Sequence, residues 1–301
     1  MVGTSSWADA GFVEQWYPRE VSPRDRLAYF AARFETVEVN ASFYAMPEAR
    51  TVARWAQVTP AAFSFDVKLH RLLSRHGASL DAVPPDLRDA ARTSPRGRVV
   101  LDRRLERALL ERTLEVFEPL RAAGKLGAFL LQLAPSFTPY EHRLAELEPI
   151  VQALAPHPVA IELRRRSWVR EDRAAETLRW FEAVGAAFVG VDAPAADAPT
   201  IMPPLDAVTR DDLAYMRAHG RNAEGYLHGH SVEERFGYLY RDDELHEIAA
   251  RLQELAATAA LVKMHFNNNS GTDAPSAARR LREILGQDAG PPPVPAQQRL
   301  L

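Results

Sequence analysis

The chain has 301 residues, of which 47% are hydrophobic and 26% charged, a composition that suits one large α/β domain or two small ones. A formal net charge of -3 argues against bulk attraction to nucleic acid, and the absence of cysteine excludes disulfides, thiolate nucleophiles and cysteine-ligated metal clusters. No apolar run reaches the roughly 18 residues that span a bilayer, and the polar stretch 3–6 interrupts any signal-peptide core. We therefore expect a cytoplasmic protein without a membrane partner.

Short apolar runs that turn polar near their ends recur along the whole chain and predict strands. Taken in order, they lie at 1–7, 36–44, 63–70, 126–133, 158–164, 187–192, 213–219 and 260–267. Helical spacing of apolar residues predicts the elements between them, the first beginning at the cap-like pair Ser22-Pro23. These helices are expected at 23–34, 47–58, 105–123, 141–154, 171–183, 242–257 and 274–285.

Eight strands alternating with seven helices predict a single α/β domain over 1–288, a (β/α)8 TIM-like barrel. The sixth helix is expected to be degenerate or missing, because 193–209 is rich in proline. The segment 71–103 has no period and several prolines, and its length predicts a long excursion after the third strand, over the barrel mouth. The proline-rich tail 289–301 is expected to be disordered.

The strand over 36–44, T-V-E-V-N-A-S-F-Y, shows the pattern on which the predicted site depends. Val37 and Val39 face one way, while Glu38 and Asn40 face the other, late in the strand. The carboxyl ends of parallel barrel strands meet at one mouth, so the polar residues near those ends should gather there. They are Trp7, Glu38, Asn40, Lys68, His70, Gln132, Glu162, Arg164, Asp192, Arg217, His219, His265 and Asn267.

These polar residues have two interpretations. Some of them could fill the mouth as a satisfied hydrogen-bond network, but burying several charges without a task is costly, which favours a site. Glu38, Glu162 and His219 are the expected catalytic residues, with the carboxylates as acid–base groups or metal ligands. The expected substrate-binding residues are Trp7, Asn40, Tyr44, Lys68, Gln132, Arg164, Asp192, Arg221 and Asn267.

Lysine is scarce in this chain, with only Lys68, Lys125 and Lys263 among 37 basic residues. Two of the three lie in predicted strands. In a chain so rich in arginine, lysine is either kept where a compact or titratable cation is needed, or its three positions are too few to carry any meaning.

Several motifs, in order along the chain, resemble those of the DUF72 family, also called YecE-like proteins. The matching stretches are G-T-S-S-W at 3–7, W-Y-P at 16–18, F-E-T-V-E-V-N-A-S-F-Y at 34–44, T-V-A-R-W at 51–55, F-D-V-K at 65–68, L-L-Q-L-A-P-S-F at 130–137, A-I-E-L-R-R-R-S-W at 160–168, H-G-R-N at 219–222, Y-R-D-D-E-L at 240–245 and H-F-N-N-N at 265–269. The resemblance implies a TIM-like barrel whose biochemical activity has not been established. Ser6 replaces a glycine expected in the family, and His265 stands where an aromatic is more usual, which puts a catalytic role for His265 in doubt.

Three functions fit the sequence. The first is an enzyme that acts on a small polar or anionic substrate, phosphorylated or carboxylated, held by Lys68, Arg164, His219 and Arg221. The second is a divalent-metal-dependent hydrolase or phosphodiesterase with Glu38, Glu162, Asp192 and His219 as ligands. The third is a non-catalytic ligand-binding or regulatory barrel. No resident cofactor is expected apart from that possible metal, and the expected partner is a small polar or anionic ligand.

Overall fold

The computed structural model describes residues 1–268, 270–288 and 290, in which eight parallel strands close into a barrel. Around the barrel the order is β1-β10-β9-β8-β7-β6-β3-β2. The strands are β1 (Val2–Thr4), β2 (Thr36–Val39), β3 (Ser64–Lys68), β6 (Leu126–Gln132), β7 (Val159–Glu162), β8 (Ala187–Asp192), β9 (Ala214–Ala218) and β10 (Val262–Phe266). The predicted (β/α)8 architecture is therefore confirmed. All but Gly290 of the predicted tail 289–301 lies outside the described residues.

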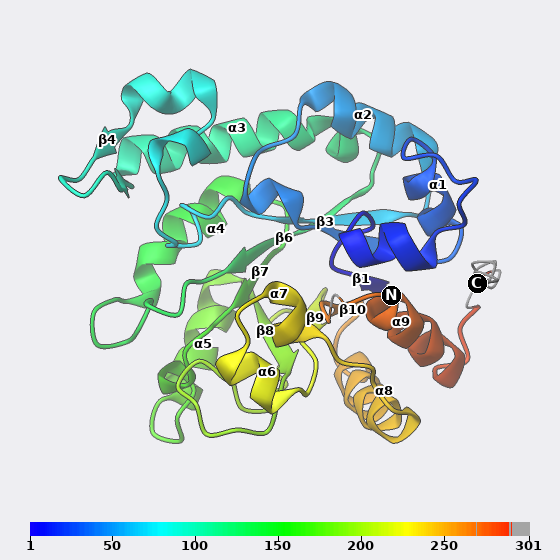
Figure 1. Ribbon diagram of the computed structural model, residues 1–301. Helices are drawn as coiled ribbons and strands as arrows, with labels where there is room; N and C mark the ends of the chain where they lie inside the picture. The colour runs from blue at the N-terminus through cyan, green and yellow to red at the C-terminus, as the bar shows by residue number, and fades with distance from the viewer. Residues whose placement is uncertain (269, 289, 291–301) are drawn as a thin grey trace.

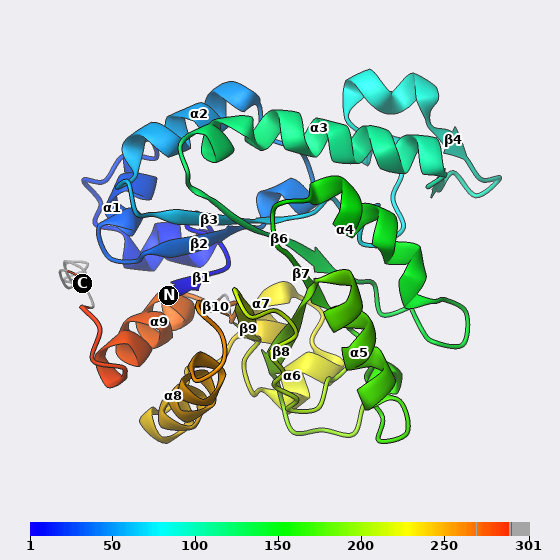
Figure 2. The same cartoon turned by 180° about the vertical axis from the view of Figure 1, so that it is seen from behind.

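Helices surround the strands and cover their outward apolar side chains (Figure 1). The helices named α are α1 (Arg26–Ala31), α2 (Ala49–Val58), α3 (Arg103–Ala122), α4 (Glu148–Leu154), α5 (Ala174–Val184), α6 (Ala223–His228), α7 (Val232–Phe236), α8 (Asp242–Ala256) and α9 (Asp273–Ile284). Helices α2 and α3 lie side by side, as the view from behind also shows (Figure 2). No helix in the described part of the chain is long and apolar enough to cross a membrane.

The connection between β8 and β9 contains no helix in any of its residues, all of which are described, so the prediction of a missing sixth helix is confirmed. Short helices α6 and α7 occupy instead the glycine- and aromatic-rich stretch after β9, where no helix was predicted. Asn222 caps α6 by accepting a hydrogen bond from the Gly225 amide at 2.9 Å. Here the local capping chemistry forms a helix too short to show a clear apolar period.

Several predicted elements are longer than the structure makes them, among them the strand over 36–44 and the helix over 141–154. The strand expected over 36–44 ends at Val39, and a 3₁₀ turn over Ala41–Phe43 follows. The Ser42 hydroxyl donates to the carbonyl oxygens of Val39 and Lys68, which holds this turn against the end of β3. The helix expected over 141–154 begins as a 3₁₀ turn, Leu144–Leu147, before α4.

The long excursion after β3 has two parts. Residues 70–76 form a compact turn beside the strand ends, where the Arg71 amide donates to the Phe43 carbonyl and the Ala134 amide to the Ser74 carbonyl. The remainder holds two 3₁₀ turns, Leu80–Ala82 and Pro85–Ala90, and a small hairpin of β4 (Arg92–Thr93) and β5 (Val99–Val100). Figure 1 shows that hairpin near the start of α3, at the edge of the molecule. That the excursion covers the mouth stays a prediction.

Candidate functional site at the barrel mouth

The centre of the barrel mouth is occupied by a buried guanidinium between two buried carboxylates. Arg217, on β9, donates to Glu38 through Nε at 3.0 Å and Nη2 at 2.7 Å, and to Glu162 through Nη1 at 2.6 Å. All three side chains are fully buried. The paired geometry is that of a strong charge-assisted interaction, and it joins β2, β7 and β9 across the barrel.

A chain of polar contacts continues from Glu162 toward the strand ends. Glu162 Oε1 accepts from Gln132 Nε2 at 2.9 Å and lies 3.0 Å from His219 Nε2. On the other side of the ring, His219 Nδ1 lies 3.1 Å from Asn267 Nδ2, and Asn267 Oδ1 accepts from Asn40 at 3.4 Å. An amide that donates to Nδ1 leaves Nε2 as the protonated ring nitrogen, so His219 is a neutral imidazole that donates to Glu162.

Burial and charge together set the ionisation of this cluster. Burial alone would raise the pKa of Glu162, but Arg217, His219 and Arg164 act in the opposite direction and hold that pKa well below its usual value. The pKa of Glu38 is also lowered, chiefly because Arg217 opposes the effect of burial. Burial lowers the pKa of His219 despite its contact with Glu162. The cluster thus holds two carboxylates, a guanidinium and a neutral imidazole near neutral pH.

Lys68 lies at the end of β3, partly buried, and close enough to Arg217, Glu38 and Glu162 for their charges to act on its amine. Its Nζ stands 4.6 Å from the centroid of the Phe43 ring and makes no hydrogen bond or ion pair with any described residue. Burial, followed by the nearby charge of Arg217, lowers the pKa of Lys68 to about 7, although Glu38 and Glu162 oppose that effect. Lys68 therefore carries an unengaged amine that titrates near neutrality.

Arg164 borders the same region on the far side of Glu162. Its Nη2 donates to the Tyr226 hydroxyl of α6 at 2.7 Å, and its Nε lies 3.6 Å from Glu162 Oε1. Its Nη1 has no hydrogen-bond partner among the described residues. The charges of Lys68 and Arg164 both lower the pKa of His76, after the larger effect of burial, to about 4. The groups at this mouth that remain available to a ligand, the Lys68 amine and Arg164 Nη1, are therefore basic.

A second polar group lies inside the barrel below Glu38. Asp66 accepts from Lys263 Nζ at 2.6 Å and from the Ala128 amide at 2.6 Å, and its other oxygen stands 3.3 Å from His265 Nε2. A Cβ at Gly127 would lie 2.3 Å from both Asp66 Oδ1 and Lys263 Nζ, so only glycine leaves room for this pair. Tyr215 stacks on His265 and donates to Glu38 at 3.2 Å, which connects the two polar layers.

Two residues predicted for the mouth lie instead on the outer side of the barrel wall. Asp192 accepts from Arg221 at 2.8 Å, from Tyr240 at 2.7 Å and from Arg251 of α8 at 3.0 Å. The register pairs Val191 with Arg217, so it is Val191 that faces the interior and Asp192 that faces α8. The expectation that Asp192 and Arg221 join the Glu38 group was therefore wrong. They form an ion network that attaches α8 to the barrel.

The two aromatic residues predicted to bind substrate also lie away from the Arg217 group. Trp7 packs edge-on against Trp55 of α2 and Phe65, with ring centroids 5.1 and 6.5 Å apart, in the layer between strands and helices. The chain leaves the line of β1 at Ser6, whose φ of 128° redirects it. Tyr44 is 63% exposed and follows the 3₁₀ turn that ends the second strand. Neither ring lines the interior of the mouth.

The four ligands proposed for a divalent metal do not converge. Glu38 and Glu162 are both occupied by Arg217, and Asp192 belongs to the outer network with Arg221 and Arg251. Within the described residues, no group of three or more histidine, aspartate and glutamate side chains is placed to hold a metal ion. A metal bound to both carboxylates would have to displace Arg217. The residues present do not fit the predicted metal site.

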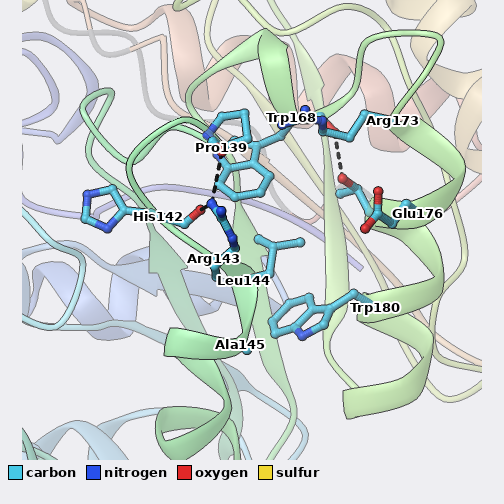
Figure 3. Close-up of a pocket in the computed structure, with 10 residues that line it drawn as sticks. Pro139, His142, Arg143, Leu144, Ala145, Trp168, Arg173, Glu176 and Trp180 are labelled. Carbon is cyan, nitrogen blue, oxygen red and sulfur yellow. Dashed lines mark hydrogen bonds between the residues drawn. The ribbon is translucent and has the colours of Figure 1, made fainter.

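A separate cavity lies outside the barrel, between residues 139–145 and α5, with a volume of about 360 Å³ (Figure 3). Its walls include Trp168 and Trp180, whose indole nitrogens donate to the Phe137 carbonyl and to Glu148. Arg143 is held by the carbonyls of Pro139 and His142. Because both indoles and Arg143 already have partners, we rank this cavity below the mouth as a candidate site.

Arg217 is the central residue that the predicted site omitted. It was expected at a strand end but given no role, although Tyr215, Arg217 and His219 alternate along A-Y-M-R-A-H. Three polar side chains at that spacing all point into the barrel. A cation at the middle position is the signal that would have identified the partner of two inward carboxylates.

A closed parallel barrel with charged side chains from several strand ends at its mouth defines a TIM-type barrel with a candidate ligand site. The chain belongs to the family described as "Protein of unknown function DUF72", whose sequence profile matches residues 1–299. A curated relative, the UPF0759 protein YunF of Bacillus subtilis (strain 168), is 27% identical over 288 residues, or 94% of each chain.

Two solved structures support the same assignment. A DUF72 family protein of Enterococcus faecalis V583 is 26% identical, with a TM-score of 0.79 over 95% of each chain. Another, from Thermotoga maritima MSB8, is also 26% identical, with a TM-score of 0.73 over 95% of this chain and 98% of that one. The predicted family and fold are thereby confirmed, and none of these relatives has an established activity in its description.

Proposed function

We propose that the barrel mouth binds a small anionic metabolite, carboxylated or phosphorylated, and that Lys68 exchanges a proton with it. The observation that carries this proposal is the unengaged amine of Lys68, set beside a central group whose charges are all paired. An unpaired cation in a partly buried place is costly to the fold, which favours a role with a ligand. Arg164 Nη1 supplies a second cation for the anion.

The carboxylates Glu38 and Glu162 are unsuited to proton transfer near neutral pH, because Arg217 keeps both ionised. Lys68 is better matched, since a general base works best when its pKa lies near the working pH. In this proposal Glu162 and Asn267 hold His219 in place, and the partly exposed side chain of Asn267 offers a polar contact to the neutral part of the ligand. A cytoplasmic location stays a prediction.

Ligand-induced thermal stabilisation tests the proposal. Wild-type protein is screened at pH 7 against small carboxylates and phosphate monoesters, alongside uncharged analogues of each. We expect anions, and not their analogues, to raise the melting temperature. Lys68→Met and Arg164→Gln should abolish the shift, whereas Arg170→Gln, an exposed arginine on the following loop, should retain it. Equal shifts in all variants would contradict binding at the mouth.

Turnover assays on the anions that bind then separate an enzyme from a binding barrel. An enzyme should convert at least one of them in the wild-type protein and lose that activity in Lys68→Met. Binding that depends on Lys68, without conversion of any hit, would favour the non-catalytic alternative.

A further inference from the structure

The three lysines of this chain differ in what their amines contact. Lys125 Nζ donates to the Ala56 carbonyl at 2.5 Å and to the Thr59 carbonyl at 2.7 Å. Lys263 Nζ is held by Asp66 at 2.6 Å and by Ser64 at 2.8 Å. Among the described residues, Lys68 Nζ contacts only the face of the Phe43 ring. Within the part of the chain that the structure describes, Lys68 is therefore the lysine whose amine makes no hydrogen bond or ion pair.

The surroundings of Lys68 favour the neutral amine over the ammonium ion. The amine lies in a partly buried position near two guanidiniums, those of Arg217 and Arg164, which disfavour a further positive charge. A lysine that is desolvated and set beside other cations is activated as a nucleophile, because a larger fraction of it carries a free lone pair. Being only partly buried, Lys68 is also open to a small ligand at the mouth.

We propose that Lys68 forms a Schiff base with the carbonyl group of a small anionic oxo compound, such as a 2-oxo acid or an aldehyde that carries a carboxylate or phosphate. This inference rests on the proposed function and names its substrate class. A carbonyl carbon is the electrophile that an unprotonated amine attacks reversibly, and the anionic group of the same molecule is the part that Arg164 binds.

The step balances without any oxidant or reductant. The Nζ lone pair forms a bond to the carbonyl carbon while the C=O π pair moves to oxygen, giving a carbinolamine after proton transfer from nitrogen to oxygen. The hydroxyl then takes up a proton from solvent and leaves as water, and the nitrogen lone pair forms the C=N bond of a protonated imine. One water is released, and hydrolysis reverses the reaction.

Reductive trapping of the full-length protein tests the inference. Glyoxylate and pyridoxal 5′-phosphate serve as anionic probes and propionaldehyde as the neutral one, each with cyanoborohydride, and peptide mass spectrometry locates the label. We expect the anionic probes to label Lys68 at least tenfold more than Lys125 or Lys263, with labelling falling as the pH drops below 7. The N-terminal amine, which donates to the Val262 carbonyl at 2.8 Å, is the internal reference.

Two variants make the result specific. Lys68→Arg keeps the positive charge and should retain anion-induced thermal stabilisation while losing the label. Lys125→Arg is the matched change at a lysine whose amine is held by hydrogen bonds. It should keep both the anion-induced stabilisation and the label on Lys68. A Lys68→Arg protein that is labelled as strongly as the wild type would overturn the inference, since the label would then lie elsewhere.

The remaining outcomes distinguish this inference from the proposed function beneath it. Anion-induced stabilisation without any label on Lys68 would overturn the Schiff base and leave the anion site standing. Neither stabilisation nor label would overturn both. Equal labelling by propionaldehyde and glyoxylate would overturn the anionic substrate class, and label spread evenly over the lysines and the N-terminus at every pH would overturn the special reactivity of Lys68.

Discussion

Arg217 stabilises the barrel from its interior. Among the described residues, its guanidinium is the only buried positive charge in direct contact with both Glu38 and Glu162. Removing one partner of a buried ion group leaves the others uncompensated, which costs more than the group contributes when intact. The stability of the barrel therefore depends on Arg217, Glu38 and Glu162 together, and replacing any one of them leaves the other two without full compensation.

We expect Arg217→Met to lower the free energy of unfolding by about 3–5 kcal/mol, because two carboxylates lose their buried counter-ion. Urea denaturation followed by circular dichroism measures it. The triple variant Glu38→Leu, Arg217→Met, Glu162→Leu should be less destabilised than the single one. Arg107→Met, at an exposed pair with Glu111, should leave the midpoint unchanged. A loss below about 1 kcal/mol for Arg217→Met would contradict the role assigned to the cluster.

Lys68 should show the opposite behaviour, since its charge destabilises the fold. Its pKa is about 7 in the folded protein against 10.5 in the unfolded chain, so the unfolded state binds more protons between these values. The cost is complete below pH 7 and fades as the pH rises toward 10.

Lys68→Met should therefore raise the free energy of unfolding by about 1–3 kcal/mol at pH 7, and the gain should shrink as the pH approaches 10. Urea titrations of both proteins at pH 7, 8.5 and 10 measure it. A gain that is absent at pH 7, or independent of pH, would show that the amine is not a strained cation.

At the scale of single elements, β8 shows where prediction from sequence stops. Its sequence A-F-V-G-V-D is apolar on both faces. Alternation therefore does not show which residues face the barrel interior, and the sequence allows Asp192 at the end of the strand to face either side. The phase is fixed by the pairing of Val191 with Arg217, a contact between strands that a single sequence does not contain. In β2 and β7, by contrast, one face is polar, and the inward positions of Glu38 and Glu162 were correctly predicted.

The excursion after β3 should divide into two mobilities. Amides at 71–76 are bonded to the barrel and to one another, whereas 85–98 contains short 3₁₀ turns and a hairpin of two-residue strands. We expect exchange at 85–98 to be at least a hundredfold faster than in β2, with 71–76 in between. Hydrogen exchange with mass spectrometry resolves the three segments. Protection at 85–98 equal to that of β2 would contradict this division.

Across the whole molecule, the fold was predictable because eight apolar runs and seven amphipathic stretches alternate in order. The arrangement of the site was only partly predictable. Period-2 spacing placed Lys68, Gln132, Glu162 and His219 inside, but it could not show that Ser6 redirects the chain before Trp7, or that a 3₁₀ turn carries Tyr44 outward. Those depend on backbone geometry after a strand ends, where alternation no longer applies.

Stability of the whole protein should fall steadily in mild acid. Burial keeps His265 neutral and lowers its pKa from 6.5 to about 4. The charges of Lys263 and Arg217 lower this pKa further, whereas those of Asp66 and Glu38 oppose the shift. The unfolded chain thus binds the extra proton between these values, and stability decreases as the pH falls through that window. Glu162, whose pKa is lowered, adds a loss that begins below about 4.5.

We expect His265 alone to account for about 3 kcal/mol of this loss between pH 6.5 and 4. Urea denaturation of the wild type and of His265→Gln at half-unit pH steps measures it, and the variant should have a shallower slope over that range. Parallel curves for the two proteins would exclude His265 as the source.

The pairing of β1 with β10 has a consequence for biosynthesis. Val2 aligns with Met264 and Thr4 with Phe266, so β1, which leaves the ribosome before the other barrel strands, gains its second neighbour only after the other seven have followed. Until then the growing sheet keeps two open edges, each able to pair with other nascent chains. Chaperone occupancy on translating ribosomes should therefore persist until β10 has emerged, and nascent chains arrested before Val262 should be its preferred clients.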